Sequence, residues 1–165
     1  MFFTKNYQLI TIDETDLIEI RTIFNSNRSL LLKHTGADAV SQEWCLLEYR
    51  DMLERGFSRY KILAAEKSPA IGFMDFKISE ETYLSLLILH GSQQRRGIGE
   101  ELCSGFEEFV RSHNSKSIRI DVVTDYDETT LGFWLKNGYI MEEEIMLSWG
   151  ENRLSAQKMI KRLYQ

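Results

Sequence analysis

The chain has 165 residues, of which 43% are hydrophobic and 27% are charged, and its formal net charge is −5. These values predict one globular domain over residues 1–165 with a proper hydrophobic core. The acidic balance argues against a nucleic-acid partner, because nucleic-acid binders are usually basic. No apolar run approaches the ~20 residues of a membrane span, and the N-terminus turns polar too soon for a signal peptide. We therefore expect a cytoplasmic protein without a membrane partner.

The cysteines and histidines show no metal-binding pattern. Cys45 and Cys103 both fall in helical stretches, and their separation matches neither a metal site nor a redox pair. We expect two buried, reduced thiols. His34, His90 and His113 are scattered without ligand spacing, so we assign no metal.

The N-terminal part of the chain predicts a strand and a helix, followed by a segment without a regular pattern. Residues 7–12 have strand composition, and Asp13 or Thr15 is placed to cap the helix. Residues 28–40 combine leucines with His, Gly and Asp at no fixed period. Such a segment is either a packed connector or the wall of a pocket.

A second helix and a hairpin come next. Ser41 is a good helix cap, and apolar residues at helical spacing follow it. Residues 60–66 and 71–78 predict two strands joined by a turn at the single proline. The alternation in the second strand changes phase after Phe73, which indicates a bulge.

The rest of the chain alternates between strands and helices before it ends in a hairpin. The predicted elements are a buried strand at 84–89, a helix at about 97–113, a strand at 117–123, a short helix at 128–136 and long strands at 139–149 and 153–164. The element order of the whole chain is therefore β-α-α-β-β-β-α-β-α-β-β, which predicts an α/β (α+β) fold.

Between the buried strand and the helix that follows it lies the loop Gln94–Gly99, with the sequence Q-R-R-G-I-G. The first turn of a helix has unpaired N–H groups and the positive end of the helix dipole, so it attracts phosphate. Gly97 and Gly99 allow close approach to the backbone, and Arg95 and Arg96 add positive charge. The loop predicts an anion site suited to a diphosphate. The alternative is a polar, helix-capping loop with two solvated arginines.

Two other phosphate-binding loops fit the sequence poorly. The Walker loop requires Gly-Lys-Ser/Thr at the helix start, and none is present. The dinucleotide-binding loop requires a third Gly or Ala where this chain has Leu102, and it normally opens its domain.

The loop, together with its flanking strand and helix, resembles the Q/R-x-x-G-x-G/A loop of the GNAT family of N-acetyltransferases, and the element order is similar over nearly the whole chain. The resemblance implies a mixed, mostly antiparallel central sheet flanked by helices, and direct transfer of an acetyl group from acetyl-CoA to a primary amine. It also implies that the strand before the loop splays from the strand at 117–123. The residues that would contact acetyl-CoA are Leu87, Ile88 and Leu89, along the pantetheine arm, and Gln94, Arg95, Arg96, Gly97, Ile98, Gly99 and Glu100, around the diphosphate.

This chain departs from the family at the catalytic acid. Many members place a Tyr on the helix after the next strand, and the matching residue here is Trp134, whose indole is too weak an acid. The neighbouring motif positions, Asp127 and Thr130, depart as well. Three interpretations remain: water protonates the thiolate, Tyr126 does so, or the protein is a non-catalytic acyl-CoA-binding or sensing module. For the base, family members often use a Glu near the strand before the loop, and Glu81 occupies that position here.

The resemblance also bears on the acceptor and the assembly. In the family, the region between the first two helices shapes the acceptor site, so residues 28–40 are a candidate for substrate selection. The acceptor is expected to be a small-molecule or peptide amine, and nothing in the sequence identifies it. Many members dimerise through their C-terminal strands, which predicts a homodimer. Glu143 on one of these strands is placed to pair with Lys158 across the hairpin.

Overall fold

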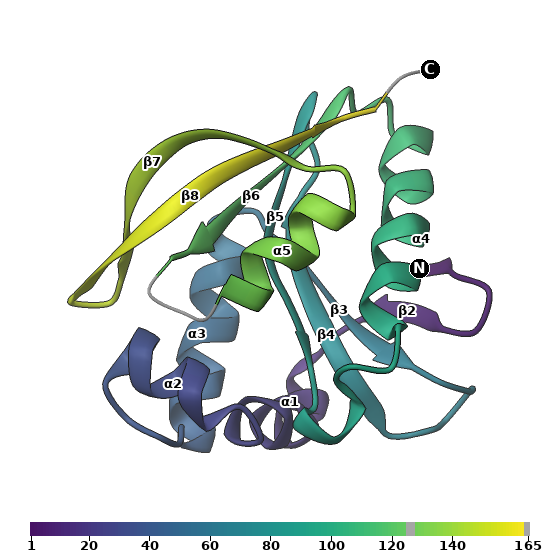
Figure 1. The fold of residues 1–165 in the computed structure, drawn as a ribbon. Coiled ribbons are helices and arrows are strands. Elements are labelled where there is room, and N and C mark those ends of the chain that lie inside the picture. The colour runs from purple at the N-terminus through teal and green to yellow at the C-terminus, as the bar shows by residue number, and fades with distance from the viewer. Residues whose placement is uncertain (125–127, 164–165) are drawn as a thin grey trace.

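A single sheet runs through the part of the chain that the computed structural model describes, residues 1–124 and 128–163 (Figure 1). Its eight strands lie in the order β1-β2-β3-β4-β5-β6-β8-β7. Strands β5 and β6 pair in parallel, and all other neighbours in this sheet are antiparallel. The strands are β1 (Phe2–Phe3), β2 (Gln8–Thr11), β3 (Ser58–Leu63), β4 (Ala70–Lys77), β5 (Glu81–Leu89), β6 (Ser117–Val123), β7 (Ile140–Trp149) and β8 (Asn152–Arg162). The predicted mixed, mostly antiparallel sheet is confirmed.

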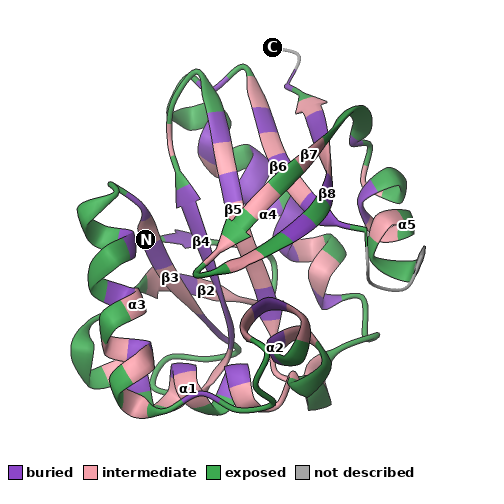
Figure 2. Cartoon of the chain, turned by 90° about the vertical axis from the view of Figure 1, so that its left-hand side faces the viewer, coloured by how far each residue is buried: buried purple, intermediate pink, exposed green. Residues whose placement is uncertain are grey.

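Helices cover both faces of this sheet (Figures 1 and 2). One hydrophobic cluster packs α1, α2 and α3 onto one face, and another packs α4 and α5 onto the opposite face. The helices are α1 (Leu17–Asn25), α2 (Arg28–Thr35), α3 (Gln42–Glu54), α4 (Ile98–Ser112) and α5 (Glu128–Lys136), with short 3-10 turns at η1 (Glu14–Asp16) and η2 (Gly91–Gln93). Among the described residues, no helix is long and apolar enough to cross a membrane.

Capping side chains begin the helical segments as the sequence predicts. Asp13 Oδ1 accepts a hydrogen bond from the Thr15 N–H (2.8 Å), and the Asp13 N–H donates to Asp16 Oδ2 (3.0 Å). Ser41 Oγ accepts from the Trp44 N–H at 3.1 Å, which fixes the first turn of α3. These contacts satisfy amides that the helices leave unpaired.

Helix α4 is the most clearly amphipathic element and holds the loop against the sheet. Its buried side repeats every four residues and consists of Ile98, Leu102, Phe106 and Val110. Cys103 lies on the same side, and burial raises the pKa of its thiol to about 12. Both cysteines are buried and free, as predicted.

Residues 28–35 form α2, so the prediction of a wholly irregular segment is wrong. Gly36 ends the helix in the left-handed conformation (φ 76°), and its N–H donates to the Leu32 carbonyl (3.0 Å). Only Leu31 and His34 are buried in this helix, and its three consecutive leucines do not produce a helical period. The short strand β1 was also missed, because two residues cannot show alternation.

The bulge predicted after Phe73 of β4 is absent; β4 has an extra residue earlier, at Ile71 against β3, and a second irregularity lies on β5. The extra residue is Ser85 of β5. The pairs on either side are Asp75 with Leu86 and Phe76 with Leu84. Strand β4 is buried on both faces, so its sequence has no polar alternation that reports the register.

Candidate active site

The parallel strands β5 and β6 are paired only near their beginnings. Three residue pairs join them, the last between Tyr83 and Arg119. Beyond this point β5 stays paired with β4 as far as Leu89, and β6 stays paired with β8 as far as Val123. The two strands therefore diverge, as the family resemblance implies.

The bulge of β5 lies where this divergence begins. Because Ser85 is an extra residue, Leu84 belongs to the hydrophobic cluster under α4 while Leu86 packs against the cluster under α1–α3. A bulged residue has no ladder partner on the paired side, and β6 has already turned away on the other side. On the side that faces β6, the backbone of β5 beyond Tyr83 therefore has no strand partner in the sheet.

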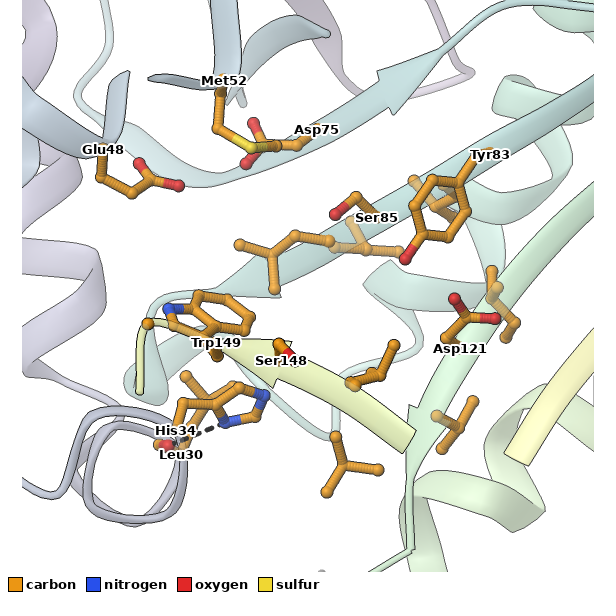
Figure 3. A pocket seen from close by; sticks show the side chains of 18 of the residues that line it. Leu30, His34, Glu48, Met52, Asp75, Tyr83, Ser85, Asp121, Ser148 and Trp149 are labelled. Carbon is orange, nitrogen blue, oxygen red and sulfur yellow. Dashed lines mark hydrogen bonds between the residues drawn. The ribbon is translucent and has the colours of Figure 1, made fainter. Parts of the chain in front are cut away.

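A cavity of about 620 Å³ lies at the opening between β5 and β6 (Figure 3). Its walls come from both faces of the sheet. The lining includes His34 of α2, Glu48 of α3, Leu87 of β5, Asp121 of β6, Trp134 of α5 and Trp149 of β7. One cavity therefore brings together side chains from both faces of the sheet.

The loop before α4 presents backbone amides. Arg95 and Gly97 adopt the left-handed conformation (φ 60° and 77°), which curls the chain at the start of the helix. Turns of this kind direct several N–H groups to one side, where they bind anions. Within residues 1–124 and 128–163, no hydrogen bond is made by the N–H groups of residues 94–97. The geometry fits the predicted diphosphate site.

The charged side chains around the loop also suit an anion. Arg95 and Arg96 are exposed, and neither forms an ion pair with any described residue. Arg96 Nη1 donates to Gln93 Oε1 at 3.2 Å. Glu100, in the first turn of α4, pairs with Lys136 of α5 (2.6 Å), which neutralises the carboxylate nearest the loop.

Helix α5 connects the loop with the cavity. A Cβ on Gly99 would lie 3.0 Å from the Phe133 ring, so the close approach of α5 to the start of α4 depends on this glycine. Trp134, the next residue on α5, lines the cavity. No residue between 94 and 100 lines the cavity itself, and of the predicted acetyl-CoA contacts only Leu87 does so among the described residues.

A hydrogen-bond network fastens the loop to the start of α2. Asn27 Nδ2 donates to the Leu89 carbonyl (3.0 Å), and Gln94 Nε2 donates to Asn27 Oδ1 (2.7 Å) and to the same carbonyl (3.3 Å). Ser26 Oγ accepts from the Gly91 N–H at 2.9 Å. The Gln94 side chain and the Leu89 carbonyl are thus engaged within the protein, so contacts of these residues with acetyl-CoA would use their other backbone groups.

The wall of the cavity formed by α3, which we call the α3 wall, rests on three buried charges. Arg59 of β3 donates through Nε and Nη2 to Asp75 of β4 (2.7 and 2.9 Å) and through Nη1 to Glu48 of α3. The side chains of Arg59 and Asp75 are 1% exposed, and that of Glu48 is 16% exposed. Burial raises the pKa of Glu48 to about 7; the Asp75 carboxylate acts in the same direction, and Arg59 opposes the shift. Burial also raises the pKa of Asp75, again with Arg59 in opposition.

A further polar group lies where β5 and β6 separate. Asp121 accepts two hydrogen bonds from Arg119 (3.0 and 2.9 Å), and the Tyr83 hydroxyl points toward the same carboxylate (Figure 3). Burial and the Asp121 carboxylate raise the pKa of Tyr83 to about 12. A hydroxyl with a raised pKa is a weak proton donor near neutral pH.

Of the two predicted catalytic residues, only Glu81 lies in the part of the chain that the structure describes. Glu81 is exposed at the paired end of β5 and does not line the cavity, and Tyr126 lies outside the described residues. Trp134 is 9% exposed and packs edge-on against Phe133 (4.9 Å) and Tyr139 (5.2 Å). It is a core residue that also forms part of the cavity wall.

The end of the C-terminal hairpin closes over α2 at one side of the cavity. The Trp149 ring contacts the His34 ring edge-on at 4.4 Å, and Asn152 Nδ2 donates to the His34 carbonyl (2.8 Å). Leu30 and His34 of α2 line the cavity, so this segment forms the wall of a pocket. Elsewhere in the hairpin, Lys158 pairs with Glu143 (3.4 Å), as predicted, and with Glu142 (3.1 Å).

Sequence reasoning missed the three charges of the α3 wall. One signal was present: Asp75 lies between Met74 and Phe76 in an otherwise apolar strand. A carboxylate in such a run is buried and requires a cationic partner. The sequence did not identify Arg59 as that partner or Glu48 as its neighbour. Among the described residues, no group of three or more side chains has the composition and proximity of a metal site.

Comparison with known proteins agrees with this geometry. Residues 33–163 match the family model described as an acetyltransferase (GNAT) domain. The chain therefore belongs to the GNAT acetyltransferase family. No curated protein matches it.

Several solved structures share its fold. An acetyltransferase from Salmonella typhimurium that modifies the N-terminal serine of a ribosomal protein has a TM-score of 0.78 at 15% identity, with 98% of this chain and 97% of that chain covered. The spermidine N-acetyltransferase of Vibrio cholerae, in complex with CoA and spermine, has a TM-score of 0.74 at 16% identity, with 96% of each chain covered. An acetyltransferase from Thermus thermophilus has a TM-score of 0.76 at 18% identity, with 99% and 100% covered.

Proposed function

We propose that this protein transfers an acetyl group from acetyl-CoA to a primary amine while both are bound. The observation that carries the proposal is the cavity between the diverging strands β5 and β6, whose lining residues come from both faces of the sheet. Such a cavity would let a donor and an acceptor meet within the protein. Holding two reactants together in this way supplies a large part of a catalyst's rate enhancement.

The residues on the α4 side fit the donor. The amides of residues 94–97 and the unpaired Arg95 and Arg96 would hold a diphosphate. The free backbone of β5 at Ser85 would orient the acyl carbonyl and stabilise negative charge on its oxygen. Acetyl-CoA supplies an activated acyl group as a thioester.

The residues on the α2 and α3 side fit the acceptor. They combine the apolar rings of Trp44 and Trp149 with the carboxylate of Glu48. The Salmonella and Vibrio proteins of similar fold act on a protein N-terminus and on spermidine, respectively. A primary amine is common to both, which supports this class of acceptor here.

The donor site can be tested with a matched pair of variants at Gly97. Asn and Asp both tolerate a left-handed conformation and both cap helices, so Gly97→Asn and Gly97→Asp differ mainly in charge. Acetyl-CoA at ~100 times its dissociation constant should stabilise the parent by about 2.7 kcal/mol, seen as a raised melting temperature. We expect Gly97→Asn to keep most of this shift. Gly97→Asp should bind acetyl-CoA at least ~10-fold more weakly, because its carboxylate repels the diphosphate.

Transfer itself is tested by release of the CoA thiol in the presence of amines. Spermidine, 2-phenylethylamine and a peptide with a free N-terminus cover the acceptor classes. Stabilisation by acetyl-CoA without amine-dependent thiol release would favour the non-catalytic acyl-CoA-binding module, for which Trp134 at the position of the family's acid is the supporting observation. Absence of any stabilisation in the parent would contradict the proposal altogether.

A further inference from the structure

The three charges of the α3 wall do not balance. Two carboxylates, Glu48 and Asp75, share the single guanidinium of Arg59. Asp75 uses both oxygens in its paired hydrogen bonds, whereas Glu48 receives a hydrogen bond only at Oε2. With both carboxylates ionised, the group holds one uncompensated negative charge, and an uncompensated charge is costly to bury.

The unbalanced charge faces the cavity. Glu48, Asp51, Met52 and Arg55 lie on one face of α3, at positions separated by three or four residues, and all four line the cavity. Asp51 and Arg55 pair with each other at 3.3 Å, so their charges cancel. Among the described residues, Glu48 Oε1 has no hydrogen-bond partner, and Figure 3 shows the Glu48 carboxylate directed into the cavity.

We propose that Glu48 binds the ammonium group of the acceptor through its free Oε1 and removes the proton that makes this nitrogen nucleophilic. The inference rests on the proposed function and adds a residue and an acceptor type to it. An ammonium ion supplies the second positive charge that the group of Glu48, Arg59 and Asp75 lacks. The site therefore suits one cationic centre.

The cavity walls indicate what carries that ammonium. Around Glu48 the lining is mostly apolar or aromatic: Trp44 and Leu47 come from α3, Leu30 from α2, and Leu147 and Trp149 from β7. Additional ammonium groups would meet no unpaired carboxylate on these residues. An acceptor with a single primary ammonium on an apolar body fits better than a polyamine.

The chemical step balances with Glu48 as the proton acceptor. The carboxylate takes one proton from R–NH₃⁺, which leaves R–NH₂ and a neutral carboxylic acid. The nitrogen attacks the thioester carbonyl, a C–N bond forms, the C–S bond breaks, and the second nitrogen-bound proton ends on the departing CoA thiolate. Glu48 then returns its proton to solvent, since its side chain remains 16% exposed.

The environment of Glu48 prepares it for this step. Its pKa is raised to about 7, chiefly by burial, and a general base is most effective when its pKa is near the working pH. The titratable and charged groups that face it are Arg59 from β3, Asp75 from β4, Cys45 and Asp51 from α3 itself, and His34 from α2 across the cavity. Burial lowers the pKa of His34 and raises that of Cys45, so both stay neutral at neutral pH.

The test uses 2-phenylethylamine as the probe, with saturating acetyl-CoA, and follows kcat/KM from about pH 5.5 to about pH 10. In the parent the rate should rise through about pH 7, as Glu48 loses its proton, and fall above the pKa of the amine, as the ammonium is lost. Glu48→Gln should lower kcat/KM at neutral pH by roughly 100-fold or more. In this variant the rate should increase up to the pKa of the amine, because only neutral amine can react.

A control variant separates a specific role from a general effect of charge. Glu54→Gln removes an exposed carboxylate of the same helix that does not line the cavity. It should keep kcat/KM within about threefold of the parent, a difference of about 0.7 kcal/mol. An equal loss in Glu54→Gln overturns the inference, and so does a kcat/KM of Glu48→Gln that still rises through about pH 7 as in the parent.

A second measurement keeps the inference testable if Glu48→Gln folds poorly. Carboxyl ¹³C resonances of glutamate in the parent, assigned by comparison with Glu48→Asp, report the titration of Glu48 directly. Adding 2-phenylethylamine and free CoA should lower the pKa of Glu48, because a bound cation favours its charged form. No change in this titration, in a parent that acetyl-CoA does stabilise, contradicts the role of Glu48. A parent that acetyl-CoA does not stabilise contradicts the proposed function instead.

Discussion

The phosphate loop (residues 94–99) and the α3 wall are constructed in different ways, and only the α3 wall lines the cavity. The loop depends on backbone: residues 94–99 are contiguous, and their geometry comes from two left-handed residues and the start of a helix. The α3 wall depends on side chains: Glu48, Arg59 and Asp75 come from a helix and two strands and meet only in the folded chain. A backbone site tolerates many side-chain changes, whereas a site made of shared charges does not.

The largest expected effect comes from breaking the α3 wall at its centre. Arg59→Leu would leave Asp75 buried without a cation, which should lower the free energy of unfolding by about 3–5 kcal/mol. Arg50→Leu is the matched control, because Arg50 forms an exposed pair with Glu14 (3.0 Å). It should cost less than ~1 kcal/mol. Urea denaturation at neutral pH measures the stability of both variants. Equal losses of stability would contradict the expected difference between the buried ion pair of Arg59 and the exposed ion pair of Arg50.

The difference between a site made of adjacent residues and a site made of distant residues also explains which features the sequence predicted. The loop, α4 and the strand before the loop were predicted because glycine spacing and helical period are local signals. Strand β6 and helix α5 have the residue ranges that the sequence indicated. In each case residues close in sequence determine the structure.

The features that the sequence did not predict depend on contacts between distant residues. The bulge at Ser85 is set by the register with β4, whose two buried faces show no alternation. The partnership of Glu48 with Arg59 spans a turn between a helix and a strand, and Glu48 alone resembles any solvated helix residue. Glu81 was predicted to be the base because it begins the strand before the loop, yet it does not line the cavity.

A smaller effect should appear in the pH dependence of stability. The pKa of Glu48 is about 7 in the folded protein, against 4.5 for an exposed Glu, so the folded state binds the proton more tightly. Stability contributed by this group is therefore present below about pH 4.5 and is lost as the pH rises to about 7. Relative to the parent, Glu48→Gln should gain about 3 kcal/mol across this window. Chemical denaturation at several pH values measures the gain.

The control for this prediction is Glu54→Gln, which should show no pH-dependent difference from the parent, since Glu54 is exposed. A difference in stability between Glu48→Gln and the parent that does not change with pH would mean that the group of three charges is balanced in the folded protein. The reason for an ammonium ion at this wall would then disappear.

The attachment of the phosphate loop to the start of α2 can be weakened at Asn27. Asn27→Ala removes the hydrogen bonds to the Leu89 carbonyl and from Gln94, and should cost about 1–2 kcal/mol in stability. It should also weaken acetyl-CoA binding by roughly 3- to 10-fold, because the loop loses its attachment to α2. Asn25→Ala is the control, since among the described residues Asn25 makes two side-chain hydrogen bonds, both with the Val40 backbone. Calorimetric titration should show weaker binding in the first variant alone.

The smallest expected effect concerns Glu100, which the sequence placed among the acetyl-CoA contacts. Its carboxylate pairs with Lys136 near the anion site, and an exposed pair contributes less than ~1 kcal/mol. Glu100→Gln removes a negative charge beside the loop, so acetyl-CoA affinity should rise by roughly two- to threefold at low salt. The gain should vanish in 1 M salt, where the screening length is about 3 Å. Glu108→Gln, on an exposed position of the same helix away from the loop, should leave the affinity unchanged. A loss of affinity in Glu100→Gln would instead mean that the Glu100 side chain contacts acetyl-CoA directly. Binding at the loop would then depend on a side chain as well as on the backbone.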